Sequence, residues 1–178
     1  MGNRLSKIVT RTGDAGTTGL ATGERVGKSD PRVHALGEVD ELNCHLGVVL
    51  AHDVPDPVVR MLTRIQHELF NLGGELSMPG SALIKPDDVE RLEQDVVTLN
   101  DALPPLKEFV LPGGTPAAAA AHLARTVCRR AERALWALHG QAPLSADTLR
   151  YANRLSDLLF VVARTLARAG GREIIWAR

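Results

Sequence analysis

One segment of the chain, residues 117–139, combines a helical period with a row of side chains suited to binding an anion. At about 100° per residue, the row lies within a sector of roughly 80°, with Arg133 at its edge and Arg130 outside it. Its members are His122, Arg125, Arg129, Glu132 and Trp136. Guanidinium groups are permanently charged and fork onto phosphate oxygens, so the row could bind phosphate with Glu132 holding the arginines in place.

The alternative interpretation of this row is a solvated helix face. Glu132 would then pair with Arg129 three residues earlier, which stabilises a helix by only about 0.2–0.5 kcal/mol. The geometry of the segment alone favours the solvated face. The rest of the chain must decide between the two.

A second candidate for phosphate binding is the segment 3–31, which lacks a helical period and is rich in Gly, Thr and basic residues. Gly13, Gly16 and Gly19 recur at every third position among threonines, which leaves backbone N–H groups free beside hydroxyls. The segment contains neither GxxxxGK[ST] nor GxGxxG. A mobile, solvated arm is therefore an equally good interpretation.

Metal ligation is the chemistry suggested by His34, Glu38, Glu41 and His45, which share the outer face of a predicted helix. Carboxylate-bridged di-metal bundles use Glu-x-x-His motifs, and this chain has none. We therefore expect a solvated stripe and no metal site. Asp40 lies about 100° away from Glu41, where it could meet a cation from another helix or another subunit.

The elements that must position these residues are helices. Apolar residues recur at spacings of three and four from Pro31 to about His52 and over 56–78, 86–103, 117–139 and 146–169. This pattern predicts an all-α fold, a five-helix up-down bundle in a ferritin-like arrangement. We expect a single domain over 1–178, with an irregular N-terminal arm (1–31), the helical bundle (32–170) and a C-terminal tail (171–178).

Several positions carry more detailed expectations. Thr115 should cap the fourth helix, with Pro116 as its first residue. Leu123 should lie in the buried stripe of that helix, and Arg164 should face away from the core in the last one. Phe109 lies in the loop FVLPGG, and a loop phenylalanine most often plugs a core. The apolar tail should pack back onto the bundle or reach a neighbour.

Composition excludes several classes of function. The 21 basic and 21 acidic residues give a formal net charge of zero, which argues against binding to nucleic acid or membrane surfaces. No apolar run approaches the roughly 18 residues of a membrane span, and the first ten residues lack a signal-peptide core, so we expect a cytoplasmic protein. Cys44 and Cys128 are far apart and are expected to be buried thiols.

Five blocks of sequence are recognisable together. They are TRTGDAGTTGL at 10–20, GEVDELN at 37–43, FVLPGG at 109–114, RTVCRRAER at 125–133 and NRLSDLLF at 153–160. In this order they closely resemble the ATP:cob(I)alamin adenosyltransferases of the trimeric, PduO-like family. Any one block would be a weak signal, but the set spans nearly the whole chain.

The resemblance implies a homotrimer with active sites between adjacent subunits, and ATP and reduced cobalamin as substrates. It assigns ATP to the N-terminal arm and to the charged row, with Lys28 closing on phosphate. The implied nucleotide-binding residues are Thr10, Arg11, Thr12, Gly13, Asp14, Thr18, Gly19, Lys28, Arg129, Arg130, Glu132, Arg133 and Asn153. The assignment of Arg130 to the nucleotide conflicts with the helical projection, which places Arg130 outside the row. Ala15 departs from the family, because many relatives have a charged residue there that could contact phosphate.

The implied reaction moves the 5′-deoxyadenosyl group of ATP onto cobalt and releases triphosphate. Reduced cobalt is the nucleophile, which explains the absence of an activated nucleophilic side chain. By resemblance Phe109 lies under the corrin and displaces the lower axial ligand. The resemblance also implies a salt bridge between Asp40 and Arg125 of adjacent subunits. It assigns stabilisation of the leaving triphosphate to Arg129, Lys28 and Mg²⁺. A flavoprotein reductase and an adenosylcobalamin-dependent enzyme are the implied protein partners.

Two other functions stay open from the sequence. A ferritin-like di-metal oxidase would share the bundle, although the missing Glu-x-x-His motif disfavours it. A non-catalytic cobalamin carrier or nucleotide sensor would use the same binding residues as the enzyme.

Overall fold

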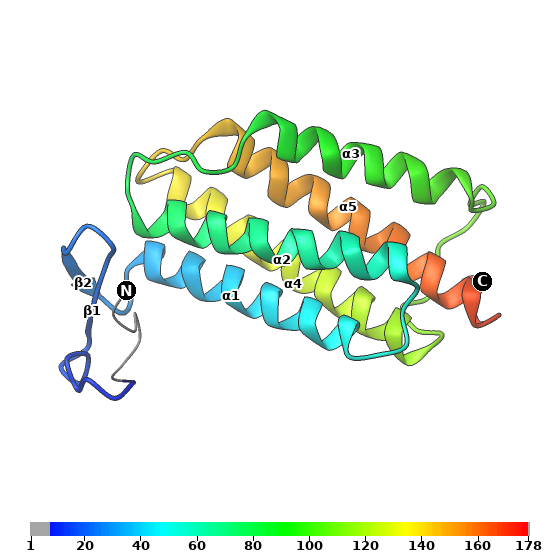
Figure 1. The fold of residues 1–178 in the computed structure, drawn as a ribbon, viewed down its shortest axis with the longest axis horizontal. Helices are drawn as coiled ribbons and strands as arrows, with labels where there is room; N and C mark the ends of the chain where they lie inside the picture. Colours follow the sequence, from blue (N-terminus) through cyan, green and yellow to red (C-terminus); the bar gives the residue numbers. More distant parts are fainter. Residues whose placement is uncertain (1–7, 178) are drawn as a thin grey trace.

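The computed structural model describes residues 8–177. Five long helices run side by side along the longest axis of the molecule (Figure 1). They are α1 (Pro31–Leu50), α2 (Asp56–Ser77), α3 (Pro86–Asp101), α4 (Pro116–His139) and α5 (Ala146–Ala169). The prediction of an all-α five-helix bundle is confirmed, and the helix bounds agree with those expected to within two residues at every end.

Local capping explains why the helices begin where they do. The Thr115 hydroxyl accepts a hydrogen bond from the Ala118 N–H at 3.1 Å, and Pro116 follows as the first residue of α4, as predicted. The Ser145 hydroxyl caps α5 in the same way by accepting from the Thr148 N–H at 3.1 Å. These caps satisfy backbone donors that the first helical turn leaves free.

The core lies between the helices and is built mainly from leucine, valine and alanine, with Ile65, Ile84 and Tyr151 also fully buried. α4 packs against α1 on one side and against α5 on the other, while α5 also contacts α3. Two buried carboxylates tie α2 to its neighbours: Glu68 accepts from the Tyr151 hydroxyl at 2.7 Å, and Glu75 accepts from the Leu83 N–H at 2.8 Å. No helix within residues 8–177 has the length and apolarity that crossing a bilayer requires.

The burial of α4 differs from the predicted stripe at two adjacent positions. Leu123, expected in the core, is half exposed, whereas His122, expected on the outer face, is only 3 % exposed. The reason is that α4 is flanked by both α1 and α5, so its buried sector is wider than one stripe.

The C-terminal tail packs back onto the bundle, as predicted. It runs beside the loop that follows α3, where Val110 pairs with Ile175 and the Trp176 N–H donates to the Phe109 carbonyl at 2.7 Å. Arg164 was expected to face away from the core but is buried, because its Nε donates to Glu173 of the tail at 2.8 Å and its NH2 donates to the Pro104 carbonyl at 3.0 Å.

The N-terminal arm contains a structure that the sequence did not predict. Strands β1 (Thr17–Gly19) and β2 (Arg25–Gly27) pair in antiparallel register, with Thr18 opposite Val26. Leu20 is buried, and the Ala21 N–H donates to the Ser77 carbonyl at 3.0 Å, which anchors this hairpin to the end of α2. Strands of three residues are too short to show an alternating pattern, so the hairpin left no signal.

The two cysteines differ. Cys128 is buried in α4 and its thiol donates to the Ala152 carbonyl at 3.3 Å, whereas Cys44 on α1 is exposed, contrary to expectation. Burial raises the pKa of the Cys128 thiol far above its ordinary value, so this thiol is inert.

Candidate functional site

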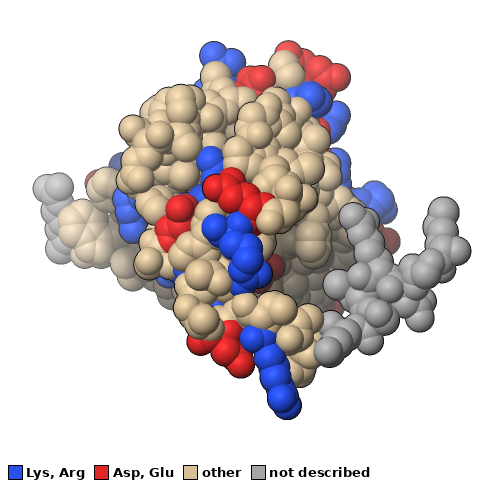
Figure 2. Space-filling model, turned by 90° about the vertical axis from the view of Figure 1, so that its left-hand side faces the viewer, with Lys and Arg blue, Asp and Glu red and all other residues tan. Residues whose placement is uncertain are grey.

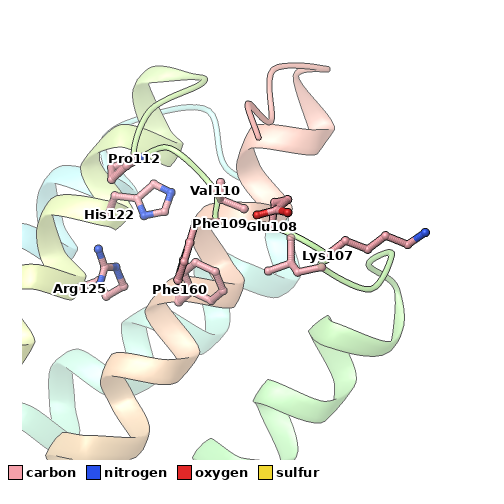
Figure 3. A pocket seen from close by; sticks show the side chains of 9 residues that line it. Lys107, Glu108, Phe109, Val110, Pro112, His122, Arg125 and Phe160 are labelled. Carbon is pink, nitrogen blue, oxygen red and sulfur yellow. The ribbon is translucent and has the colours of Figure 1, made fainter. Parts of the chain in front are cut away.

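A cavity of about 490 Å³ lies between α4, α5 and the loop that joins α3 to α4 (Figure 3). Phe109 projects into it from the loop with 76 % of its surface exposed, so the interpretation of this residue as a core plug is wrong. Its ring makes an edge contact with Trp176, with 6.3 Å between ring centroids. The tail therefore holds the loop so that an apolar ring faces open space.

Two basic side chains of α4 point toward Phe109 and Phe160 in this cavity (Figure 3). His122 is buried, and both of its ring nitrogens lack a hydrogen-bond partner within residues 8–177. Arg125 is half-buried, and its Nε also lacks a partner in that range. Burial first, and the charge of Arg125 second, lower the pKa of His122, so its imidazole is neutral at pH 7.

The charged row continues along α4 one turn beyond Arg125. The Arg129 guanidinium is exposed and has no hydrogen-bond or ion-pair partner in the described part of the chain. The solvated-face interpretation predicted an ion pair between Glu132 and Arg129, but Glu132 does not pair with Arg129. Instead, the Glu132 carboxylate accepts from the Asn153 side-chain amide of α5 at 3.0 Å. The structure thus leaves a free guanidinium beside an ordered carboxylate and amide.

A smaller cavity of about 310 Å³ opens beside this pair. Glu132, Trp136, Asn153 and Arg154 contribute to its walls. Arg154 is ordered there by donating to the Asn153 side-chain oxygen at 2.7 Å. Sequence analysis placed Trp136 in the charged row, which is consistent with its position in this cavity. It did not identify Arg154 as a candidate residue.

Arg130 turns away from the row, as the helical projection predicted, and joins α4 to α1. Its Nε donates to Glu38 at 2.5 Å and its NH2 donates to Glu41. The hydrogen bond from Arg130 lowers the pKa of Glu41, against the opposing effect of partial desolvation. The expected solvated stripe on α1 is thus wrong at Glu38, which is buried under Arg130.

The predicted nucleotide residues of the arm form a compact group of their own. The Gly16 N–H donates to the Gly13 carbonyl at 3.2 Å and closes a turn, and Gly16 has a positive φ of 80° that favours glycine. A Cβ atom on Gly13 would lie 3.2 Å from the Lys28 Nζ, so the ammonium sits over this turn. Other exposed or half-buried members of the group are Thr10, Arg11, Thr12, Asp14, Thr18 and Gly19.

Within residues 8–177, the arm lies away from the Phe109 loop, near which the charged row of α4 begins. The arm lies at one end of the bundle, beside the start of α1, while the Phe109 loop lies at the opposite end beside α5 (Figure 1). Figure 2 looks onto the end with the arm, where basic and acidic side chains are interspersed. No hydrogen bond or ion pair between described residues joins the arm to α4; the arm bonds to α2 instead.

Asp40 and Arg125 are also apart. Asp40 is exposed and lines a cavity of about 630 Å³ between the arm, α1 and α2, together with Phe70, which is 72 % exposed. Arg125 lines the separate cavity around Phe109. Neither residue has an ion-pair partner within 8–177, so both charges are free to pair with another molecule.

Comparison with known proteins identifies the family. The sequence model described as Cobalamin adenosyltransferase matches residues 8–166. The chain belongs to the cobalamin adenosyltransferase family. It is 57 % identical to the Cobalamin adenosyltransferase of Cupriavidus metallidurans, over all of this chain and 98 % of the relative. It is 42 % identical to the Corrinoid adenosyltransferase of Mycobacterium leprae, over 99 % of this chain and 98 % of the relative.

Solved structures agree with this adenosyltransferase assignment. A variant of the PduO-type ATP:corrinoid adenosyltransferase from Lactobacillus reuteri, complexed with cobalamin and ATP, superposes with a TM-score of 0.90 at 34 % identity, covering 97 % of this chain and all of that chain. A second variant, complexed with ATP, has a TM-score of 0.88 at 34 % identity, covering 96 % and 100 % of the two chains. The resemblance found in the five sequence blocks is confirmed.

Family membership disfavours the di-metal oxidase. The described residues contain no group of three or more His, Cys, Asp or Glu side chains placed to hold a metal ion. His34 and His45 lie instead 3.7 Å from Glu38 and Glu41, the carboxylates that Arg130 binds.

Proposed function

We propose that this chain transfers the 5′-deoxyadenosyl group of ATP to the cobalt of cob(I)alamin. The reduced cobalt attacks C5′, the C5′–O bond breaks, and triphosphate leaves with the bonding electron pair. Since the nucleophile belongs to the substrate, the protein has to position C5′ against cobalt and to stabilise the charge that grows on the triphosphate.

One observation carries this proposal: Arg125 and Arg129 of α4 stand one turn apart, and neither side chain has a hydrogen-bond or ion-pair partner among residues 8–177. Arg125 lines the largely apolar cavity that contains Phe109, which suits the flat corrin ring. Arg129 stands next to Glu132 and Asn153, which suits a nucleotide. A helical turn spans about 5.4 Å, so ligands bound at the two places would touch.

The residues take the following roles in this proposal. Phe109 fills the space under the corrin and keeps water and the lower ligand away from cobalt. Arg129 and Lys28 bind the triphosphate, and the Glu132–Asn153 pair orients the nucleotide. Mg²⁺ would arrive on the phosphates, and no step depends on a protein site for it.

We further propose that the site is completed between subunits of a homotrimer. Among residues 8–177, no bond joins the arm to α4, and neither Asp40 nor Arg125 has an ion-pair partner. A second copy that brings its arm to α4 would join both halves. An ion pair between Asp40 and Arg125 across that interface would be costly to break, by about 3–5 kcal/mol when desolvated.

A direct assay tests the function. The purified chain, mixed with chemically reduced cobalamin and MgATP, should form a light-sensitive Co–C product and release one triphosphate for each adenosyl group transferred. Binding of both substrates without product would instead identify a cobalamin carrier or nucleotide sensor.

A further inference from the structure

His122 is unusual among the buried polar residues of this protein. The other buried polar and charged side chains in the described range, such as Glu68, Glu75 and Arg164, each make at least one hydrogen bond. His122 alone among them lacks a partner at every polar side-chain atom. A buried polar group without a partner is costly, and folded proteins rarely keep one without a reason.

The surroundings of His122 indicate a ligand rather than simple packing. Its ring lies edge-on to Phe160, with 6.3 Å between ring centroids, in the wall of the 490 Å³ cavity. The nearby Arg125 Nε, in the same wall, is also buried and unpartnered. The two residues that carry these unsatisfied nitrogens therefore line one cavity, and a polar group of a molecule bound there could become their partner.

The protonation state of His122 restricts the chemistry of that group. A neutral imidazole has one N–H donor and one acceptor nitrogen. The adjacent Arg125 guanidinium disfavours a second positive charge, since it and burial both lower the pKa of His122. A cationic group is excluded for the same reason. A primary carboxamide, which is uncharged and offers both a donor and an acceptor, fits best.

We propose that His122 is a binding residue for the corrinoid substrate and recognises a primary carboxamide on the rim of the corrin ring. This inference rests on the proposed function, because it requires the corrin to occupy the Phe109 cavity. His122 does not take part in the transfer itself. It selects corrinoids whose rim carries amides and fixes the ring above Phe109.

The test uses the full chain and two probes, a corrinoid with primary amides around its rim and the same corrinoid with methyl esters instead. His122→Phe removes both nitrogens and keeps a ring beside Phe160, while His122→Gln keeps a donor and an acceptor. Leu123→Ala is the matched control, because Leu123 is the next residue of α4 and is half exposed. Binding of each probe and of ATP is measured by absorbance titration and calorimetry.

We expect the wild-type chain to prefer the amide probe over the ester probe by about tenfold, the effect of one well-made hydrogen bond to a buried group. His122→Phe should lose this preference while its affinity for ATP and its melting temperature stay unchanged, and His122→Gln should retain most of it. An undiminished preference in His122→Phe, equal binding of both probes by the wild type, or no corrinoid binding at all would overturn the inference.

The binding readout separates this inference from the proposed function. A wild-type chain that prefers the amide probe but forms no Co–C bond would disprove the proposed activity and leave the role of His122 in binding supported.

Discussion

Glu38 of α1 and Arg130 of α4 are joined by a hydrogen bond of 2.5 Å between the Glu38 Oε2 and the Arg130 Nε. Glu38 is almost completely buried, and Arg130 also binds the exposed Glu41 one turn further along α1. The family resemblance assigned Arg130 to the nucleotide, whereas these contacts assign it to the packing of α1 against α4.

Arg130→Ala should therefore destabilise the fold without weakening ATP binding. The substitution leaves the buried Glu38 carboxylate without its strongest partner, which should lower the melting temperature by about 2–4 °C or more. The dissociation constant for ATP, measured by calorimetry, should stay within about twofold of wild type. A large loss of ATP affinity with an unchanged melting temperature would restore Arg130 to the nucleotide site.

Arg129→Ala should have the opposite phenotype. The Arg129 guanidinium has no protein partner in the described residues, so its removal should not lower the melting temperature. Loss of a charged hydrogen bond to phosphate should weaken ATP binding by about 10- to 100-fold. Arg60→Ala, at an exposed arginine of α2, is the control and should bind ATP normally.

Phe109→Ala should slow the cobalt step. The side chain is already exposed to the cavity, so stability should change little, and the ATP affinity should stay nearly intact. The turnover number with reduced cobalamin should fall by about tenfold or more, because water and a lower ligand regain access to cobalt. Val97→Ala removes a similarly exposed apolar side chain from α3 and should react like wild type. If Phe109→Ala weakened ATP binding and Arg129→Ala slowed only the cobalt step, both role assignments would be wrong.

Coexpression of two inactive variants tests whether the site lies between subunits. Lys28→Ala damages the arm and Arg129→Ala damages α4. If each site takes its arm from one subunit and α4 from the next, random mixing should make about a quarter of the sites intact. Purified mixed oligomers should regain that share of wild-type activity. Recovery should be nil if the arm serves its own α4.

Glu173→Gln should reduce stability at neutral pH but not in acid. Burial raises the pKa of Glu173, but the hydrogen bonds from Arg164 and Arg168 outweigh it and hold the pKa below its ordinary value of 4.5. A lowered carboxyl pKa stabilises the fold above the unfolded-state pKa, and this contribution is lost as the pH falls through the folded-state pKa.

Denaturant unfolding at several pH values checks this prediction. At pH 7, Glu173→Gln should unfold with a free energy about 2 kcal/mol below that of wild type, because the Arg164 hydrogen bond becomes weaker. The difference should shrink steadily as the pH falls below about 4.5. Glu90→Gln, at an exposed position of α3, should show no difference at either pH.

The helices could be predicted from the sequence because their signals are local. Pro31, Thr115 and Pro116 mark helix starts through their own backbone and side-chain chemistry, and apolar spacing marks the buried face. The burial of His122 and the exposure of Leu123 could not be predicted. Consecutive residues of a helix point only about 100° apart, and the buried sector of α4 depends on two helices, α1 and α5, that come from distant parts of the chain. Arg164 was misjudged because its partner, Glu173, belongs to the tail.

The two halves of the candidate site, the charged row of α4 and the N-terminal arm, differ in how far the sequence could predict them. The charged row was visible because its residues share one helix face. The turn that places Lys28 over Gly13 was not, because it depends on a hairpin with strands too short to produce a pattern. Nothing local to Phe109 indicates that a tail more than sixty residues later supports it, as the bond from the Trp176 N–H at 2.7 Å does.

The contrast between the two cysteines has a practical use. The thiol of Cys128 is buried between α4 and α5, whereas Cys44 is exposed. A maleimide dye added to the native protein should therefore react at Cys44 alone. Cys44 lies one turn from Asp40, on the helix proposed to meet a second copy. Fluorescence energy transfer between dyes at that position would follow subunit assembly in real time without engineered labelling sites.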